Sequence, residues 1–293
     1  MKLFTGYYQN ELLLGVLKAE ETGCILLRDI GIEYETMHDF ISKHTQEELA
    51  SIKEATEPII DVEEIRFQAP IPHPRQDIIC LGINYLAHAE ESARFHKESF
   101  ERERAYPVYF SKRVNAALGD KDSIVYNKEM YEQLDYEVEL AVIIGKDAKN
   151  VKREEALDYI FGYTIMNDMS ARDIQLRHKQ WYFGKSMDGF TPMGPVITTV
   201  DEFDGIPNLK ITSKVNGEIR QNSETKLQQF DIAYVIEELS RGFTLQAGTI
   251  IATGTPAGVG MGFDPPRFLE IGDIVECEIE KIGVLRNKIT END

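Results

Sequence analysis

The sequence predicts a β-rich α+β fold, because short apolar runs separated by Gly, Pro and Asp outnumber helical patterns. The chain has 293 residues, 42% of them hydrophobic, which is enough for one large core with a small appended domain. The predicted strands lie in residues 77–85, 107–112, 139–145, 162–168, 192–199, 249–258 and 273–285.

Two segments are predicted to be helices of the main domain, residues 152–162 and 230–242. In the second, Asp231 is the expected N-cap and Gly242 the expected stop. Its apolar side chains recur at helical spacing, at Ile232, Val235, Ile236 and Leu239.

Residues 1–70 are predicted to form a small N-terminal domain, and residues 71–293 the second domain. Alternating apolar residues over 2–18 predict a hairpin, and residues 35–55 predict a polar, mostly exposed helical stretch. The proline-rich segment 69–76 is then an extended linker at the boundary.

Composition argues against several kinds of partner. Lys and Arg total 32 against 50 Asp and Glu, and the net charge of -18 repels nucleic acid and anionic membranes. No signal peptide or membrane-spanning run is recognised. Three widely spaced cysteines, Cys24, Cys80 and Cys277, do not suggest disulfides or a thiolate zinc site, so we expect a cytoplasmic protein.

The segment LDYEVELAVIIG, residues 134–145, places three acids in an apolar strand. Because side chains alternate along a strand, Asp135, Glu137 and Glu139 are expected on one face. Three buried anions need a compensating cation, and our hypothesis is a metal ion.

Asp168 ends another apolar strand 29 residues after Glu139 and is the expected third ligand, beside Glu137 and Glu139. All three offer oxygen, which Mg²⁺, Mn²⁺ and Ca²⁺ prefer. The alternative is a solvated sheet face with Asp168 capping a turn, but the flanking residues are apolar.

Three further segments carry polar side chains of interest. His88 and Glu91 are three residues apart, as in an oriented general base, although a solvated helix surface has the same pattern. Lys185, among aromatic residues, needs a substrate carboxylate or a nearby Asp as partner. The glycine-rich turn in residues 250–260 offers backbone N–H groups and the Thr255 hydroxyl to a carboxylate, but it lacks the phosphate-loop order.

Six segments in this order resemble the fumarylacetoacetate hydrolase superfamily, and the likeness covers roughly residues 70–289. The segments are GINYLAHAEE, DYEVELAVIIGK, YTIMNDMSARDIQ, GKSMDGFTPMGPV, VNGEIRQ and IATGTPAGVG. The run RHKQWYFGKSMDGFTPMGP is most similar to a bacterial branch of 2-hydroxyhepta-2,4-diene-1,7-dioate isomerases, fumarylpyruvate hydrolases and oxaloacetate decarboxylases.

The resemblance implies a rolled, mostly antiparallel β-sheet core after a small N-terminal domain, usually in a homodimer. It also implies Mg²⁺ or Mn²⁺ at Glu137, Glu139 and Asp168.

The resemblance also implies roles for six further residues. His88 and Glu91 match a dyad on a lid, and Lys185 matches a residue that stabilises an oxyanion. The positions expected near a bound 2-oxo acid are Arg172, Gln175 and Thr255. We expect the charged lid, residues 87–106, to be disordered without ligand.

The chain departs from the family pattern at two positions. Ile83 stands where many relatives carry Arg or Lys, so a basic contact near the substrate mouth is missing. Asn84 stands near a fourth carboxylate ligand of animal enzymes, which suggests a site of three carboxylates.

The expected activity is metal-dependent C–C bond cleavage of a small 2-oxo acid, with acylpyruvate or fumarylpyruvate hydrolysis slightly favoured. In this reaction His88 activates water and pyruvate leaves as an enolate. The alternatives are oxaloacetate decarboxylation, isomerisation or tautomerisation at the same site, and a non-catalytic metal-binding scaffold. No nucleic-acid or membrane partner is expected.

Overall fold

The computed structural model describes residues 1–18, 21–97, 99–100, 102 and 104–291. The strands are β1 Lys2–Tyr8, β2 Glu11–Lys18, β3 Gly23–Leu26, β4 Ile60–Asp61, β5 Arg66–Phe67, β6 Ile78–Gly82, β7 Val108–Lys112, β8 Ser123–Tyr126, β9 Leu134–Asp135, β10 Val138–Ile144, β11 Ile160–Asn167, β12 Ser170–Ala171, β13 Met193–Thr199, β14 Lys210–Val215, β15 Glu218–Glu224, β16 Ile250–Ala252, β17 Ile274–Ile279 and β18 Gly283–Glu291. The α-helices are α1 Met37–Lys43, α2 Gln46–Glu54, α3 Leu86–His96, α4 Arg172–His178, α5 Trp181–Lys185 and α6 Ile232–Gly242. The prediction of a β-rich α+β fold is confirmed.

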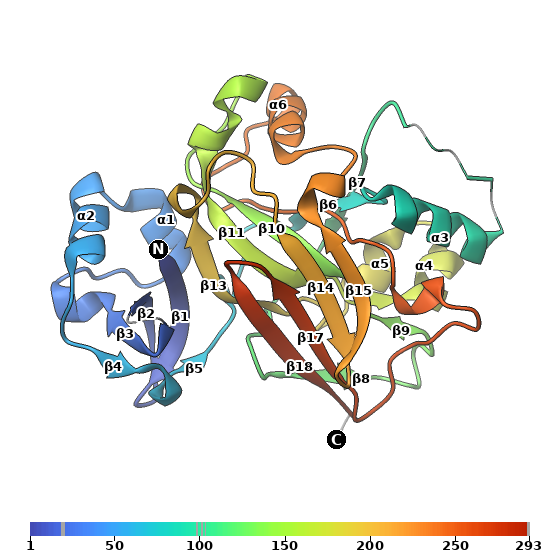
Figure 1. The fold of residues 1–293 in the computed structure, drawn as a ribbon, viewed down its shortest axis with the longest axis horizontal. Coiled ribbons are helices and arrows are strands. Elements are labelled where there is room, and N and C mark those ends of the chain that lie inside the picture. Colours follow the sequence, from blue (N-terminus) through green and yellow to red (C-terminus); the bar gives the residue numbers. More distant parts are fainter. Residues whose placement is uncertain (19–20, 98, 101, 103, 292–293) are drawn as a thin grey trace.

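Among the described residues, the largest sheet has eleven strands in the order β4-β3-β2-β1-β13-β11-β10-β16-β6-β7, with β5 paired to β1. A second sheet has five strands in the order β15-β14-β17-β18-β8. Most pairs are antiparallel, and β16 with β6 and β18 with β8 run parallel. The five-stranded sheet lies over the middle of the larger one (Figure 1).

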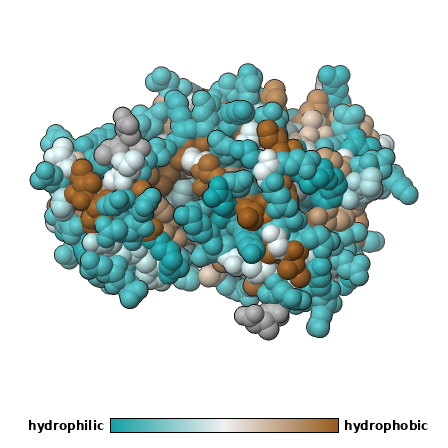
Figure 2. Space-filling model, turned by 60° about the horizontal axis from the view of Figure 1, so that its bottom comes forward, coloured by the Kyte–Doolittle hydropathy of each residue, from teal (hydrophilic) through white to brown (hydrophobic). Residues whose placement is uncertain are grey.

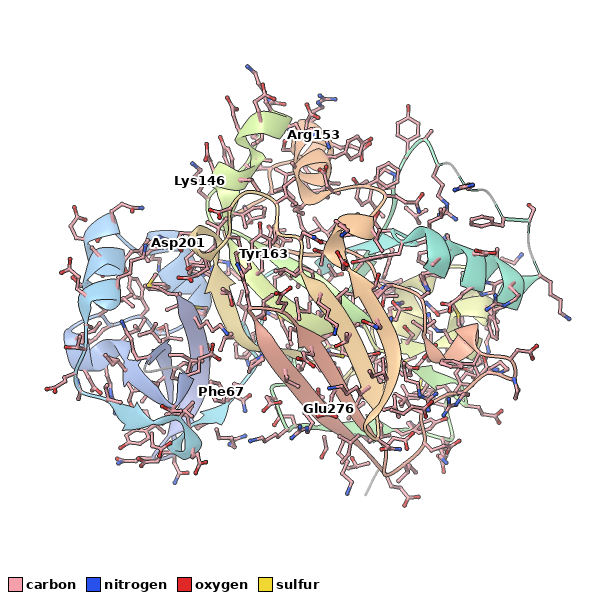
Figure 3. All side chains as sticks on the ribbon, in the orientation of Figure 1. Phe67, Lys146, Arg153, Tyr163, Asp201 and Glu276 are labelled. Atoms are coloured by element: carbon pink, nitrogen blue, oxygen red, sulfur yellow. The ribbon has the colours of Figure 1, made fainter. Side chains whose placement is uncertain are left out.

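The main core lies between these two sheets. Strands β10 and β11 are buried along their whole length and are mostly apolar, with Glu139 in β10 as a charged exception. Tyr163 of β11 is fully buried in this layer, and its ring meets the edge of Phe203 with 5.1 Å between centroids (Figure 3).

The N-terminal segment contains the predicted hairpin, β1 and β2, which turns at Gln9 and Asn10 with positive φ. Strand β1 also pairs with β13 of the large sheet. The predicted domain boundary at residue 70 stays a prediction. Segment 69–76 has no helix or strand, but its Ala69 and Ile71 are buried in the core, so its role as a linker also stays a prediction.

Two helix predictions need correction. Residues 35–55 form two helices, because Thr36 and Thr45 each cap a new one, and α1 is largely buried rather than exposed. Segment 152–162 is a 3₁₀ helix over Arg153–Tyr159 that ends where β11 begins.

The prediction for residues 230–242 is confirmed. Asp231 caps α6 and accepts a hydrogen bond from the Tyr234 N–H at 2.9 Å. The apolar side chains face the core, and Gly242 is the last helical residue.

The face of the molecule in Figure 2 is mostly hydrophilic, with scattered apolar side chains. No described helix is long and apolar enough to span a membrane.

Candidate active site

The three predicted ligands meet where β10 and β11 lie side by side. Glu137 directly precedes β10, Glu139 lies in it opposite Met166 of β11, and Asp168 directly follows β11. One oxygen of each carboxylate lies within 4.8 Å of the others, and all three residues are buried. The alternative of a solvated sheet face does not apply here.

Asp135, which was expected on the same face, is not one of the three clustered carboxylates. Strand β9 ends at Asp135 and β10 begins only at Val138, so the alternation of a single strand is interrupted. The Asp135 carboxylate accepts hydrogen bonds from Arg172 Nε at 2.9 Å and from the Gly260 N–H at 2.6 Å. Its compensating cation is therefore a guanidinium.

Basic side chains surround the three acids. Lys185 Nζ donates to Glu137 Oε2 at 2.7 Å and to Asp168 Oδ2 at 2.6 Å. Arg172 Nη1 forms an ion pair with Glu137 Oε1 at 2.6 Å. A nearby Asp was predicted as one possible partner of Lys185, and Asp168 makes that contact.

Lys112 is a functional candidate that sequence reasoning missed. It is fully buried at the end of β7, and its Nζ donates to Asp168 Oδ1 at 2.6 Å and to the Met169 carbonyl at 3.1 Å. The sequence did contain an indication of this contact. Lys112 is the last residue of the apolar run 107–112, and a buried lysine needs an anionic partner.

The acids differ in electrostatic environment. Burial alone would raise the pKa of Glu137, but Lys185 and Arg172 outweigh it and lower that pKa to about 2. Burial, Asp168 and Glu137 raise the pKa of Glu139 well above its usual value. Burial lowers the pKa of Lys112, and Asp168 opposes this effect.

The balance of buried charges indicates whether these residues fit a metal ion. Four buried acids, counting Asp135, face three buried bases, so the formal charge is one negative. Burial, and then the charges of Asp168 and Glu137, raise the pKa of Glu139, which forms no ion pair with a base among the described residues. An all-oxygen donor set with such excess charge fits Mg²⁺ or Mn²⁺.

Helix α3 carries His88 and Glu91 into the same region. His88 is 5% exposed, and its Nδ1 lies 3.6 Å from Glu91 Oε2, beyond hydrogen-bond distance. Among the described residues, this Nδ1 has no hydrogen-bond partner. Glu91 instead accepts from the Gly258 N–H at 3.0 Å. The solvated-surface alternative for this pair is wrong.

Helix α4 supplies Arg172 and Gln175, both buried. Arg172 Nη1 donates to Gln175 Oε1 at 3.3 Å, so the amide steadies the guanidinium. Arg172 Nη2 is buried without a partner among the described residues. This N–H group is available to a ligand oxygen.

The polar groups of the glycine-rich turn after β16 form hydrogen bonds within the protein. The Gly254 N–H donates to Glu139 Oε2 at 2.8 Å. The Thr255 hydroxyl donates to the Val138 carbonyl and accepts from Gln221 Nε2 at 2.7 Å. Gln221 lies in the VNGEIRQ segment, but its hydrogen bonds to this turn were not predicted.

Ile83 and Asn84, the two positions that depart from the family pattern, have distinct local environments. Ile83 lines the cavity with φ of 57°, an unusual conformation for a β-branched residue. The Asn84 amide is bound by backbone: it donates to the Phe230 and Thr253 carbonyls and accepts from the Phe230 N–H. It is therefore not free to act as a metal ligand.

The expected disorder of the lid is wrong for residues 87–96, which belong to helix α3. Glu98, Glu101 and Glu103 lie outside the described residues.

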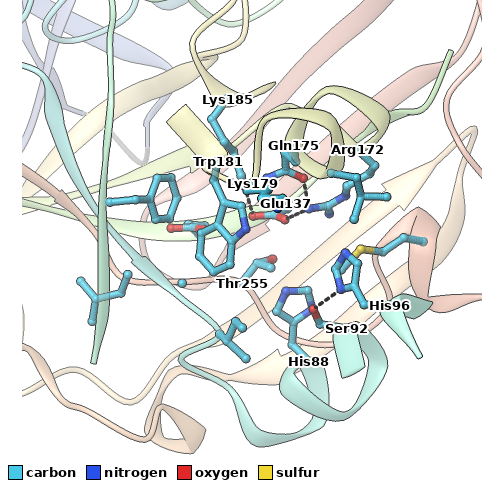
Figure 4. A pocket seen from close by; sticks show the side chains of 17 residues that line it. His88, Ser92, His96, Glu137, Arg172, Gln175, Lys179, Trp181, Lys185 and Thr255 are labelled. Atoms are coloured by element: carbon cyan, nitrogen blue, oxygen red, sulfur yellow. Dashed lines mark hydrogen bonds and ion pairs between the residues drawn. The ribbon is translucent and has the colours of Figure 1, made fainter. Parts of the chain in front are cut away.

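One cavity of about 490 Å³ gathers most of these groups (Figure 4). Of the predicted site residues it is lined by His88, Glu137, Glu139, Arg172, Gln175, Lys185 and Thr255. Glu91 and Asp168 stand behind this lining, in contact with Gly258 and with Lys185. This arrangement is typical of metal-dependent enzymes that act on small organic acids.

A comparison with protein families agrees with this description. Residues 77–290 match the family "Fumarylacetoacetate (FAA) hydrolase C-terminal", and the chain belongs to that family. The rolled, mostly antiparallel sheet implied by the resemblance is therefore confirmed.

Two curated relatives have related names. The chain is 46% identical over 226 residues to Oxaloacetate tautomerase YisK of Bacillus subtilis, covering 77% of this chain and 73% of that one. It is 43% identical over 234 residues to the mitochondrial Oxaloacetate tautomerase Fahd2a of Rattus norvegicus, covering 79% and 72%.

Two solved structures share the whole fold. A fumarylacetoacetate hydrolase from Exiguobacterium antarcticum has a TM-score of 0.84 at 36% identity, with both chains fully covered. Maleylpyruvate hydrolase from Sphingobium sp. SYK-6, in complex with manganese(II) and pyruvate, has a TM-score of 0.81 at 28% identity, again with full coverage.

Proposed function

We propose that the protein is a divalent-metal-dependent enzyme that moves the C3 proton of a small 2-oxo dicarboxylate, with oxaloacetate tautomerisation as the first candidate. The observation that carries this proposal is a buried imidazole, His88, in the same cavity as Glu137 and Glu139. The names of two relatives support placing this reaction ahead of the hydrolysis that the sequence slightly favoured.

Glu137, Glu139 and Asp168 would hold Mg²⁺ or Mn²⁺, which as a Lewis acid makes the C3–H bond beside a 2-oxo group more acidic. Arg172 Nη2 is the free donor for a substrate carboxylate. Lys185 uses two of its three N–H donors on acids, which leaves one for a substrate oxygen.

His88 is the proposed base. It takes the proton from C3 while the electron pair of that bond forms the C2–C3 double bond and the π pair of the 2-oxo group moves to its oxygen. The imidazolium then returns the proton to the 2-oxygen, which gives the enol, and the reverse sequence gives the keto acid. Glu91 stabilises the imidazolium after a small movement that closes the 3.6 Å gap.

Hydrolysis of an acylpyruvate is the second candidate, supported by the name of the maleylpyruvate hydrolase neighbour. In that reaction His88 takes a proton from water, and Lys185 donates to the developing oxyanion. Oxaloacetate decarboxylation and a non-catalytic scaffold are the remaining alternatives.

We also infer that the protein is a cytoplasmic homodimer. Light scattering would measure the number of subunits.

The test follows enol oxaloacetate by its ultraviolet absorbance in Mg²⁺ or Mn²⁺ buffer, with CO₂ and pyruvate measured separately. We expect accelerated decay of the enol without pyruvate, and a loss of roughly 100-fold or more in His88→Ala. His73→Ala, at an exposed residue remote from the cavity, is the control.

Other outcomes of this assay would indicate one of the alternative reactions. Pyruvate with CO₂ from oxaloacetate indicates a decarboxylase, and pyruvate without CO₂ from acylpyruvates indicates a hydrolase. If no substrate reacts faster than in buffer, or His88→Ala retains full rate, the proposed role of His88 is overturned.

A further inference from the structure

Each of the three clustered carboxylates has one oxygen bound by a protein donor of its own. The three donors come from separate parts of the chain: helix α4, the turn after β16 and strand β7. The contacts are those of Arg172 Nη1 with Glu137 Oε1 at 2.6 Å, the Gly254 N–H with Glu139 Oε2 at 2.8 Å, and Lys112 Nζ with Asp168 Oδ1 at 2.6 Å. The protein therefore restrains one oxygen of every acid in the cluster.

The other oxygen of each acid is turned away from these donors. Lys185 Nζ lies 2.7 Å from Glu137 Oε2 and 2.6 Å from Asp168 Oδ2, so these two oxygens face the same ammonium. Glu137 thus lies between Lys185 and Arg172, each bound to a different oxygen (Figure 4). Glu139 Oε1 has no hydrogen bond or ion pair with a described residue, and Glu139 lines the cavity. Each acid therefore offers one oxygen to a common cation.

Lys112 restrains Asp168 from the side away from the cavity. Among the described residues, Lys112 and Lys185 are the buried lysines, but only Lys185 lines the cavity. Lys112 Nζ also donates to the Met169 carbonyl at 3.1 Å, so its ammonium is held at two points. The Asp168 carboxylate cannot present both oxygens to a cation without losing its bond to Lys112.

The number of oxygens that a carboxylate offers affects which divalent ion fits. Ca²⁺ takes roughly six to eight oxygens and often binds both oxygens of one carboxylate. Mg²⁺ is smaller, binds about six oxygens and keeps several waters among them. Three acids that offer one oxygen each leave Ca²⁺ short of protein ligands, whereas water completes the coordination of Mg²⁺.

We propose that Lys112, together with Arg172 and the Gly254 N–H, makes the acid cluster select Mg²⁺ over Ca²⁺ by withholding one oxygen of each carboxylate. The inference rests on the proposed function, because the ion of that proposal occupies this cluster. Lys112 is a positioning residue, since it acts through Asp168 and lies outside the cavity lining.

The test measures the dissociation constants of Mg²⁺ and of Ca²⁺ by calorimetric titration of wild type and K112M. We expect wild type to bind Mg²⁺ about tenfold more tightly than Ca²⁺. In K112M the freed Asp168 Oδ1 becomes available to the larger ion, so this preference should fall about tenfold. The lost charge of Lys112 acts on both divalent ions alike and cancels in the ratio of their dissociation constants.

Two further variants separate this role from general effects of the substitution. K18M is the control, because Lys18 Nζ also donates to a backbone carbonyl, that of Ile52 at 2.7 Å, but contacts no acid of the cluster. Its preference for Mg²⁺ should equal that of wild type. Circular dichroism checks the fold of K112M. If K112M does not fold, R172M replaces it, because R172M frees Glu137 Oε1 and should lower the preference for Mg²⁺ in the same way.

Because the readout is metal binding, the two proposals fail differently. Equal affinity of wild type for Mg²⁺ and Ca²⁺, or an unchanged ratio in the folded variant, overturns the selection by Lys112 and its companion donors alone. If wild type binds neither ion, the metal site of the proposed function is itself contradicted.

Discussion

Glu137 and Glu139 lie two residues apart in the chain but stand in opposite electrostatic environments. Glu137 contacts both Lys185 and Arg172, which stabilise its ionised form. Among the described residues, Glu139 receives only the Gly254 N–H as a hydrogen-bond donor, beside the charge of Asp168. A divalent cation would supply the positive partner that Glu139 lacks among the described residues.

Replacing Glu137 by Gln keeps the shape of the side chain but removes the charge of one of the three proposed metal ligands. We expect Mn²⁺ affinity to fall by at least about 100-fold, measured by calorimetric titration, and turnover to fall with it. Glu137→Ala should behave in the same way. Glu224→Gln, at a partly exposed residue of β15, is the control. Full activity of Glu137→Gln in metal-free buffer would contradict the metal site.

Among single residues, those with a strong chemical requirement were predictable. A carboxylate inside an apolar strand has few stable arrangements, so Glu137, Glu139 and Asp168 were recognisable as a set. Lys112 was missed because its partner, Asp168, is 56 residues away in the chain.

Helix α3 is positioned by the loop that contains Gly258 and Gly262. Glu91 accepts from the Gly258 N–H, and Arg94 Nη2 donates to the Gly262 carbonyl at 2.7 Å. A Cβ atom on Gly262 would lie 2.6 Å from the Glu91 carboxylate. The contact that positions His88 therefore depends on a missing side chain.

Gly262→Ala should displace Glu91 and move α3 away from the loop. We expect the catalytic rate constant to fall by about tenfold or more, with Mn²⁺ affinity unchanged, since the proposed metal ligands lie on other elements. Kinetic assays and metal titrations measure both quantities. The control is Gly242→Ala, where a Cβ atom would meet nothing within 4 Å. Equal rates in the two variants would show that this contact does not position His88.

Helix boundaries were predictable where a capping residue acts alone. Asp231 caps α6 as expected, whereas residues 35–55 divide into two helices because Thr45 caps α2 inside an otherwise continuous polar pattern. Segment 152–162 does not form one helix, because its residues from Ile160 onward belong to β11, which pairs with β10.

The N-terminal segment contacts the main body through the large sheet and through His38 of α1. This side chain is 8% exposed, and a Cβ atom on Gly248 would lie 2.6 Å from its Nε2. Burial, and then Arg75, lower the pKa of His38 below its usual 6.5, and the nearby Asp39 opposes this shift. A neutral imidazole therefore belongs to the folded arrangement.

This lowered pKa makes stability depend on pH. The unfolded chain binds a proton at His38 near pH 6.5, whereas the folded chain binds it only at lower pH. The contribution of neutral His38 to the free energy of unfolding is thus complete above the pKa of His38 in the unfolded chain. It is lost as the pH falls toward the lower pKa of His38 in the folded chain. His38→Gln should lose less stability than wild type between pH 7.5 and 5.5.

Urea denaturation at the two pH values measures this difference. His73→Gln, at an exposed histidine, should behave like wild type. If His38→Gln loses as much stability as wild type on acidification, the proton is not excluded from His38 in the folded protein.

The sequence by itself determined the β-rich class, helix α6, the hairpin β1–β2 and the identity of the three carboxylates, because each depends on local periodicity or on the cost of burying charge. Only the tertiary structure decided that Asp135 pairs with Arg172, that Lys112 contacts Asp168, and that residues of α4 line the cavity. These contacts join segments far apart in sequence or depend on how a helix is placed against a cavity, and no local pattern specifies that placement.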